Sequence, residues 1–336
     1  MKKFQLSLML ISLLFTSACQ VNTIFQDGAS TLTMHSESTH SMTTKDFPNG
    51  FFLQPLSDID LEARAAFLMD ADRGRVLFEK NSHDALGVAS MSKIMTELLV
   101  LEAIDQGIID WDDSISISDY AYTISHQPGY ASIKLDQDKH YSVSDLFHGM
   151  AITSANGATI ALAEAVAGTE KEFVTLMNEK ADTLNLEDAN FVNSTGLTNH
   201  DLKDYHSTGL LEDYNKMSAS DLAKLSTYIL DEYPELLDMT RLPEFDILGE
   251  TIENSNWMLP QATENFLGVD FTYPEVDGLK TGFTKEAGYG FTGTVQINGT
   301  RFISVIIGTE ELGDRFVETS KLYHAIMEQG LEKTSH

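Results

Sequence analysis

The chain has 336 residues, of which 42% are hydrophobic and 22% are charged, a composition typical of a folded globular protein. Asp and Glu number 51 against 22 Lys and Arg, so the formal net charge is −29. This charge argues against a nucleic-acid partner, because phosphates bind clustered Lys and Arg, and against electrostatic docking on an anionic membrane. The single cysteine, Cys19, permits no intrachain disulfide and no cysteine-based metal cage.

The N-terminal residues have the pattern of a secretory signal. Lys2 and Lys3 precede an apolar run over residues 6–15, and small residues follow that run. We therefore predict that residues 1–18 are a signal peptide and that the protein acts outside the cytoplasm. No later segment is apolar over the 18 or more residues that a membrane-spanning helix needs.

Cys19 stands where signal cleavage would leave it at the new N-terminus. This position resembles that of the acylated cysteine of a bacterial lipoprotein, which predicts a lipid anchor on the outer face of the cytoplasmic membrane. Thr16 departs from the Leu that is usual in such signals. The alternative is ordinary cleavage after Ala18, which would leave a stray thiol on a secreted protein. Residues 19–54 are rich in Ser and Thr and are predicted to form a flexible tether.

Strand patterns occur at both ends of the remaining chain, with helical patterns between them. The predicted strands cover residues 65–70, 75–79, 278–283, 289–297 and 300–308. The predicted helices begin near residues 90 and 142, cover 157–167, 173–184 and 218–230, and end with one over 314–329. We therefore predict an α/β fold of the α+β type, in which one antiparallel sheet built from both termini lies beside a helical lobe. The folded unit is expected to span residues 55–330, followed by a tail over 331–336.

The first long predicted helix begins with a serine and a lysine three positions apart, Ser90 and Lys93. Residues i and i+3 lie on one helix face, so the amine of Lys93 can reach the Ser90 hydroxyl. A serine becomes nucleophilic when a base takes its proton, and a helix N-terminus stabilises a developing anion. Alone, this pattern arises by chance, and a capped surface helix is then the simpler interpretation.

A second polar motif, Ser154-Ala155-Asn156, lies between two predicted helices. Its hydroxyl could relay a proton, and its amide could bind a carbonyl or amide of a substrate. Ser and Asn are also common in ordinary turns, which is the alternative interpretation.

A third motif, Lys280-Thr281-Gly282, lies in a predicted strand. Its lysine and hydroxyl could hold a substrate carboxylate, and Gly282 would let an extended peptide approach the strand edge. Taken alone, Lys280 could equally be a solvated lysine on an edge strand.

The motifs S-x-x-K, S-x-N and K-T-G in this order occur in penicillin-binding proteins and β-lactamases. On these residues the chain resembles the D-alanyl-D-alanine carboxypeptidases, which are low-molecular-mass penicillin-binding proteins of the serine peptidase family S11 type. Further similarity lies at residues 89–96, 191–197, 276–284 and 287–289.

The resemblance implies a reaction and three catalytic residues. Ser90 would attack the carbonyl between the two terminal D-alanines of a peptidoglycan stem peptide, with Lys93 as its base. Ser154 would pass a proton to the leaving amine, and water would then hydrolyse the acyl-enzyme. β-Lactam antibiotics would acylate the same serine. No metal or other cofactor is expected, since the ten His form no H-E-x-x-H pattern.

The same resemblance implies the substrate-binding residues, which are Asn156, Lys280, Thr281, Gly282, Phe283 and Arg301. Asn156 would hold the substrate amide, and Lys280 with Thr281 would bind the terminal carboxylate. The backbone N–H groups of Ser90 and Phe283 would form the oxyanion hole. Arg301 would be a second carboxylate partner or, equally, an exposed strand arginine.

Three features depart from the family pattern. Ala155 stands where the family commonly has Gly, and Gly157 where it commonly has Asp. Residues 199–217 form a longer loop rich in Asp, His and Tyr, which could shape substrate access or be mere surface. The sequence also ends soon after the last predicted helix, so we expect it to lack the second β-domain and C-terminal amphipathic anchor common in this family.

Two other functions remain as alternatives. A class A β-lactamase shares the motifs but needs a glutamate to activate the deacylating water, and Glu187 with Asn190 is the candidate. Residues 186–197 match the carboxypeptidase pattern better. A non-catalytic lipoprotein that binds peptidoglycan would tolerate loss of Ser90 or Lys93, but both are present.

Overall fold

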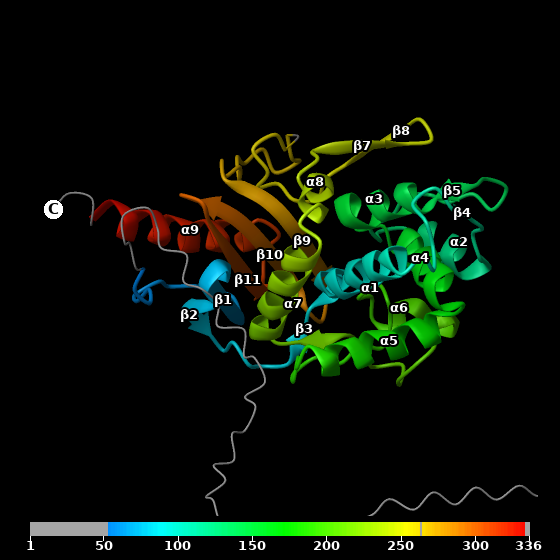
Figure 1. The fold of residues 1–336 in the computed structure, drawn as a ribbon, viewed down its shortest axis with the longest axis horizontal. Coiled ribbons are helices and arrows are strands. Elements are labelled where there is room, and N and C mark those ends of the chain that lie inside the picture. Colours follow the sequence, from blue (N-terminus) through cyan, green and yellow to red (C-terminus); the bar gives the residue numbers. More distant parts are fainter. Residues whose placement is uncertain (1–52, 263, 333–336) are drawn as a thin grey trace, which may run out of the picture. The chain divides into compact units, whose positions relative to one another are not determined.

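The computed structural model describes residues 53–262 and 264–332 (Figure 1). Five strands form one antiparallel sheet in the order β2-β1-β11-β10-β9. The strands are β1 (Ala65–Asp70), β2 (Arg75–Lys80), β9 (Val276–Thr284), β10 (Gly288–Ile297) and β11 (Thr300–Thr309). The prediction of one antiparallel sheet built from both ends of the folded chain is therefore confirmed.

Alternate side chains of the sheet belong to two different hydrophobic cores, as the two-residue period of a strand requires. On β11, Ile303 and Val305 pack into the core of the helical lobe, whereas Phe302 and Ile306 pack into a second core. The last helix, α9 (Asp314–Glu332), supplies Phe316 and other residues to that second core. The sheet thus lies between α9 and the helical lobe (Figure 1).

The longer helices of the lobe are α1 (Lys93–Asp105), α3 (Val143–Thr153), α4 (Asn156–Ala167), α5 (Glu170–Thr183) and α7 (Ala219–Glu232). Every residue of α1 from Lys93 to Leu101 is buried, which makes it the central helix of the lobe. Helix α3 begins near the predicted residue 142 with a capping box, in which the side chains of Ser142 and Asp145 accept hydrogen bonds from each other's backbone N–H groups. The predicted helices are thus present, with bounds that differ by a few residues.

The sequence pattern did not indicate several shorter elements. These are η1 (Ala71–Arg73), β3 (Leu86–Gly87), β4 (Ser114–Ile115), α2 (Asp119–Ser125), β5 (Tyr141–Ser142), α6 (Asn199–Leu202), η3 (Lys203–Tyr205), β6 (Lys216–Met217), α8 (Leu236–Thr240), β7 (Glu244–Ile247) and β8 (Glu250–Glu253). The helix predicted near residue 90 begins with the 3-10 turn η2 (Ala89–Ser92) and continues as α1. The β7–β8 hairpin packs beside α3, where the rings of Phe245 and His148 stack 3.9 Å apart.

The two described residues before the predicted boundary at residue 55 already make contacts with the folded unit. Leu53 is buried in the second core, and the backbone N–H of Gln54 donates to Gln329 Oε1 at 2.9 Å. The predicted signal peptide, Cys19 and most of the tether lie outside the described residues. Within residues 53–262 and 264–332, no helix is long and apolar enough to cross a membrane.

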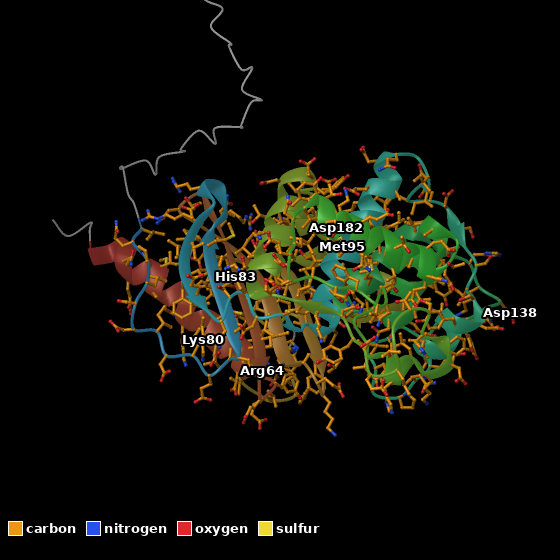
Figure 2. The ribbon with its side chains drawn as sticks, turned by 90° about the horizontal axis from the view of Figure 1, so that it is seen from below. Arg64, Lys80, His83, Met95, Asp138 and Asp182 are labelled. Atoms are coloured by element: carbon orange, nitrogen blue, oxygen red, sulfur yellow. The ribbon has the colours of Figure 1, made fainter. Side chains whose placement is uncertain are left out.

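Charged side chains lie mainly on the exterior of the described part. Asp138 and Asp182 are exposed, whereas Met95 of α1 is fully buried (Figure 2). The strong negative charge is therefore carried largely by solvated surface residues. Among the described residues, no group of three or more His, Cys, Asp or Glu is arranged to hold a metal ion.

Candidate active site

Ser90 and Lys93 meet at the junction of η2 and α1. Ser90 lies in η2, Lys93 is the first residue of α1, and Lys93 Nζ donates to Ser90 Oγ at 3.0 Å. Ser90 is only partly buried, so its hydroxyl is accessible from the cleft that it lines. The three-residue spacing therefore places an amine against an accessible hydroxyl.

Lys93 is fully buried and has three hydrogen-bond acceptors. Besides Ser90 Oγ, it donates to Asn156 Oδ1 at 2.7 Å and to the Thr195 carbonyl at 2.6 Å. Burial lowers the pKa of Lys93 well below its ordinary value, and the positive charge of Lys280 lowers it further. When the ammonium loses one proton, its lone pair can accept the Ser90 hydroxyl proton, so Lys93 can act as a base.

The Thr195 carbonyl is held in place by a buried loop. Asn193 Oδ1 accepts hydrogen bonds from the Thr195 N–H, the Thr195 hydroxyl and the Gly196 N–H. Glu170 Oε1 accepts from the Ser194 N–H and hydroxyl, and its other oxygen accepts from Tyr120. The sequence showed family similarity here but gave no role to these residues. Together these hydrogen bonds orient the Thr195 carbonyl towards Lys93 Nζ.

Ser154 caps the C-terminus of α3 in a left-handed conformation, with φ of 63°, and is one of the residues that line the cleft. That hydroxyl is buried and has no hydrogen-bond partner among the described residues. Asn156 begins α4, and its side-chain carbonyl binds Lys93. Gly157 is explained by packing, because a Cβ there would lie 2.6 Å from Ser125 Cβ on α2.

The third motif lies on β9, an edge strand of the sheet. Thr281 and Gly282 line the cleft, and Thr281 Oγ1 lies 2.8 Å from Ser255 Oγ. Lys280 is buried instead, with 1% of its surface exposed, and it donates to the Thr281 carbonyl at 3.3 Å. Its burial lowers its pKa to about 8. Lys280 is therefore not among the residues that line the cleft, and its contact with a substrate carboxylate stays a prediction.

Gly282 and Phe283 follow on the same strand. A Cβ on Gly282 would lie 2.8 Å from the Val88 carbonyl and 3.1 Å from the Met91 N–H nitrogen, which flank the nucleophile. The glycine thus lets β9 pack closely against η2, in addition to any role in admitting a peptide. Phe283 lines the cleft, and its half-exposed ring stacks on Tyr289 at 4.1 Å.

Arg301 does not lie in the cleft. Its guanidinium donates to both carboxylate oxygens of Asp277 at 2.6 Å and to Thr294 at 2.8 Å. Arg315 of α9 lines the cleft instead, and it donates to the Gly282 carbonyl at 3.2 Å. Burial lowers the pKa of Arg315 to about 10, which leaves it cationic at neutral pH. The fold thus places Arg315, and not Arg301, in the cleft, because α9 packs on β10 and β11 and Arg315 near its start reaches Gly282 of β9.

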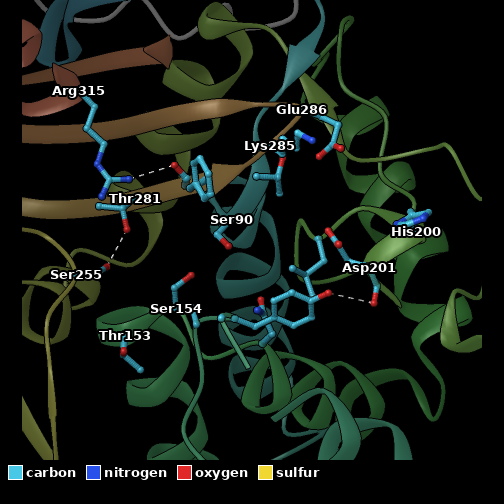
Figure 3. Close-up of a pocket in the computed structure, with 18 residues that line it drawn as sticks. Ser90, Thr153, Ser154, His200, Asp201, Ser255, Thr281, Lys285, Glu286 and Arg315 are labelled. Atoms are coloured by element: carbon cyan, nitrogen blue, oxygen red, sulfur yellow. Dashed lines mark hydrogen bonds between the residues drawn. The ribbon is translucent and has the colours of Figure 1, made fainter. Parts of the chain in front are cut away.

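The cleft has a volume of about 560 Å³. Figure 3 shows Ser90 near its centre, with Thr281 and Arg315 on one side and His200 and Asp201 on the other. The loop that departs from the family pattern therefore lines the cleft through His200 and Asp201. Glu187, the candidate base of a β-lactamase, is exposed and is not among the residues that line the cleft.

Comparison with known proteins agrees with this geometry. The sequence model of the D-alanyl-D-alanine carboxypeptidase family matches residues 53–311. The chain is 36% identical over 266 residues to D-alanyl-D-alanine carboxypeptidase DacF of Bacillus subtilis, covering 79% of this chain and 62% of that protein. It thus spans less than two thirds of that relative's length.

Two solved structures share the fold. One is a peptidoglycan synthesis regulatory factor (PBP3) from Streptococcus pneumoniae, with 34% identity and a TM-score of 0.75, covering 80% of this chain and 74% of that one. The other is penicillin-binding protein D2 from Listeria monocytogenes in its cefotaxime-bound form, with 30% identity and a TM-score of 0.68, covering 80% and 99%. By sequence and by structure, this chain belongs to the D-alanyl-D-alanine carboxypeptidase family, serine peptidases of the S11 type.

Proposed function

We propose that this protein is a serine-type D-Ala-D-Ala carboxypeptidase that removes the terminal D-alanine from peptidoglycan stem peptides. The observation that carries this proposal is the 3.0 Å contact between a buried Lys93 amine and the accessible Ser90 hydroxyl. A pKa lowered by burial supplies the neutral amine that a base requires. The relatives' names give the substrate class.

In the acylation step, Lys93 takes the hydroxyl proton while Ser90 Oγ attacks the carbonyl between the two D-alanines. The N–H groups of Ser90 and Phe283 stabilise the oxyanion in this proposal. The C–N bond then breaks, and the leaving amine takes a proton through Ser154, a cleft residue whose hydroxyl has no hydrogen-bond partner among the described residues. A water molecule adds to the resulting ester and releases the shortened peptide.

The terminal carboxylate of the substrate fits the side of the cleft at Thr281 and Arg315. Thr281 offers a hydroxyl and Arg315 a guanidinium whose Nε has no hydrogen-bond partner among the described residues. Lys280 adds positive charge from behind this wall. An arginine fork and a hydroxyl are suited to a planar carboxylate, which favours a carboxypeptidase over an enzyme that cleaves inside a chain.

β-Lactams should acylate Ser90 and leave slowly. Two Listeria structures in the same fold hold cefotaxime and ampicillin, which supports β-lactams as ligands of this site. A β-lactamase would need a glutamate beside the ester, and Glu187 is exposed away from the cleft lining. The lactamase alternative therefore has little support from the site, and a purely binding role leaves the Ser90–Lys93 pair unexplained.

We also propose that the enzyme acts outside the cytoplasm, where peptidoglycan lies, after removal of residues 1–18. Acylation of Cys19 would anchor it to the outer face of the membrane, because two acyl chains hold a protein stably. Cys19→Ser should then release the protein into the medium or leave it unprocessed. Equal membrane binding of the processed wild-type and variant proteins would show that the anchor lies elsewhere.

The enzymatic proposal is tested by measuring free D-alanine released from a synthetic peptide that ends in D-Ala-D-Ala. Wild-type protein should release one D-alanine per peptide, and the same peptide ending in L-Ala-L-Ala should be inert. The Ser90→Ala variant is the control and should release none. No release by folded wild-type protein, or equal release by Ser90→Ala, would overturn the proposal.

A further inference from the structure

A buried glutamate near the two site lysines has no role in the mechanism above. Glu97 lies on α1, one turn after Lys93, and none of its side chain is exposed. Neither carboxylate oxygen has a hydrogen-bond partner among the described residues. A buried carboxylate without donors is costly, so its charge must be balanced or it must hold a proton.

The positions of the neighbouring groups show how that balance is reached. Residues i and i+4 lie on the same helix face, and helical side chains lean towards the N-terminus, so Glu97 extends towards the turn that holds Lys93. From β9, the buried ammonium of Lys280 acts on Glu97, and from α9 the charge of Arg315 acts on Lys280. The buried cluster thus holds two lysines and one carboxylate.

The proposed reaction needs these two lysines in opposite states. Lys93 must be neutral to take the Ser90 proton, whereas Lys280 must stay charged to favour the substrate carboxylate. With Glu97 ionised, a neutral Lys93 and a charged Lys280 give a cluster with no net charge. Without a carboxylate, the same state would leave one uncompensated buried positive charge, which is unfavourable.

We propose that Glu97 is a positioning residue for the reaction, whose buried carboxylate keeps the proton on Lys280 while Lys93 serves as the base. This inference rests on the proposed function, because it assigns Glu97 to the same chemistry. The electrostatics of the cluster agree with it. Burial raises the pKa of Glu97 to about 7, and burial lowers the pKa of Lys280 to about 8, while the opposite charges of these two groups resist both shifts.

The sign of the effect follows from these charges. The negative charge of Glu97 raises the pKa of both lysines, so its removal should lower both. Lys93 would then become neutral at a lower pH, and Lys280 would lose its proton at a lower pH. Both limbs of the pH profile for acylation should therefore move to lower pH. The alkaline limb, which we expect near pH 8 from the pKa of Lys280, should move down by roughly half a pH unit or more.

The test measures the second-order rate of acylation by a fluorescent penicillin between pH 5 and 10. Glu97→Gln keeps the shape of the side chain and removes the charge. Glu102→Gln is the matched control, since Glu102 lies on the same helix but pairs with Lys180 near the surface at 2.6 Å. Glu97→Asp keeps the charge, and thermal unfolding shows whether each variant is folded.

We expect a displaced profile for Glu97→Gln, with a loss of roughly threefold or more at pH 8.5, and an undisplaced profile for Glu102→Gln. Glu97→Asp should restore most of the wild-type profile. An acylation rate that falls by the same factor at every pH would overturn the inference. If Glu97→Gln unfolds, a Glu97→Asp profile displaced to lower pH, as expected for loss of the charge, would also overturn it. Failure of wild-type protein to be acylated at any pH would instead overturn the proposed function and this inference with it.

Discussion

Replacement of Arg315 by alanine should damage recognition of the substrate carboxylate selectively. Arg315 is the cation that lines the cleft beside Thr281, and it remains charged because its pKa stays at about 10. A hydrogen bond to a charged group contributes about 1.5–3 kcal/mol. Since about 1.4 kcal/mol corresponds to a tenfold change in rate, loss of one such bond should lower kcat/KM by about 10- to 150-fold.

The assay compares kcat/KM for a peptide that ends in D-Ala-D-Ala with that for its C-terminal amide. Arg315 also donates to the Gly282 carbonyl, so its loss can disturb β9 and slow both substrates slightly. The ratio of the two rates is therefore the decisive quantity, and it should fall at least tenfold. Arg301→Ala is the matched control, because Arg301 pairs with Asp277 outside the cleft and should leave the ratio unchanged. An equal loss for both substrates in Arg315→Ala, or a selective loss in Arg301→Ala, would refute this reasoning.

Three other changes address the base, the loop and the strand. Lys93→Met should slow acylation of Ser90 by about 100-fold or more, since it removes the general base, and wild-type rates would exclude that role. Glu170→Ala should lower the free energy of unfolding in urea by roughly 3 kcal/mol, because Ser194 and Tyr120 lose a buried acceptor; an unchanged midpoint would contradict this. Gly282→Ala should slow acylation and lower Tm, because the new Cβ would lie 2.8 Å from the Val88 carbonyl, next to the nucleophile. An acylation rate equal to that of the wild type would contradict this and show that η2 shifts to accommodate the methyl group.

Local patterns predicted those parts of the fold that depend on neighbours in sequence. The pair Asn298-Gly299 has positive φ at both residues, as its hairpin turn requires, and it joins the two strands that were predicted over residues 289–297 and 300–308. The Ser142 capping box begins α3 as predicted. The contact of Lys93 with Ser90 likewise follows from their three-residue spacing at the start of α1. It does not depend on residues that are distant in the sequence.

Other parts of the site depend on tertiary packing that no local pattern reveals. Arg315 is one polar residue of an amphipathic helix, and it reaches the cleft only because α9 packs on β10 and β11 with its first turn near Gly282 of β9. The resemblance offered Arg301 as a carboxylate partner or, equally, as an exposed strand arginine, and in the fold Asp277 on β9 binds it. No motif in the sequence singles out Glu97, since the sequence does not show that α1 is buried on every face. The motif lysine Lys280 was expected in the cleft and is buried behind it.

The central claim is that Ser90, activated by Lys93, is the nucleophile of a penicillin-sensitive carboxypeptidase. Its most direct test is mass spectrometry of the protein after exposure to a penicillin, followed by peptide mapping of the adduct. We expect one penicilloyl group per chain, located on Ser90, a long-lived ester, and no adduct on Ser90→Ala. An adduct on another residue, labelling of Ser90→Ala, or rapid multiple-turnover hydrolysis of the penicillin without a stable adduct would contradict the claim.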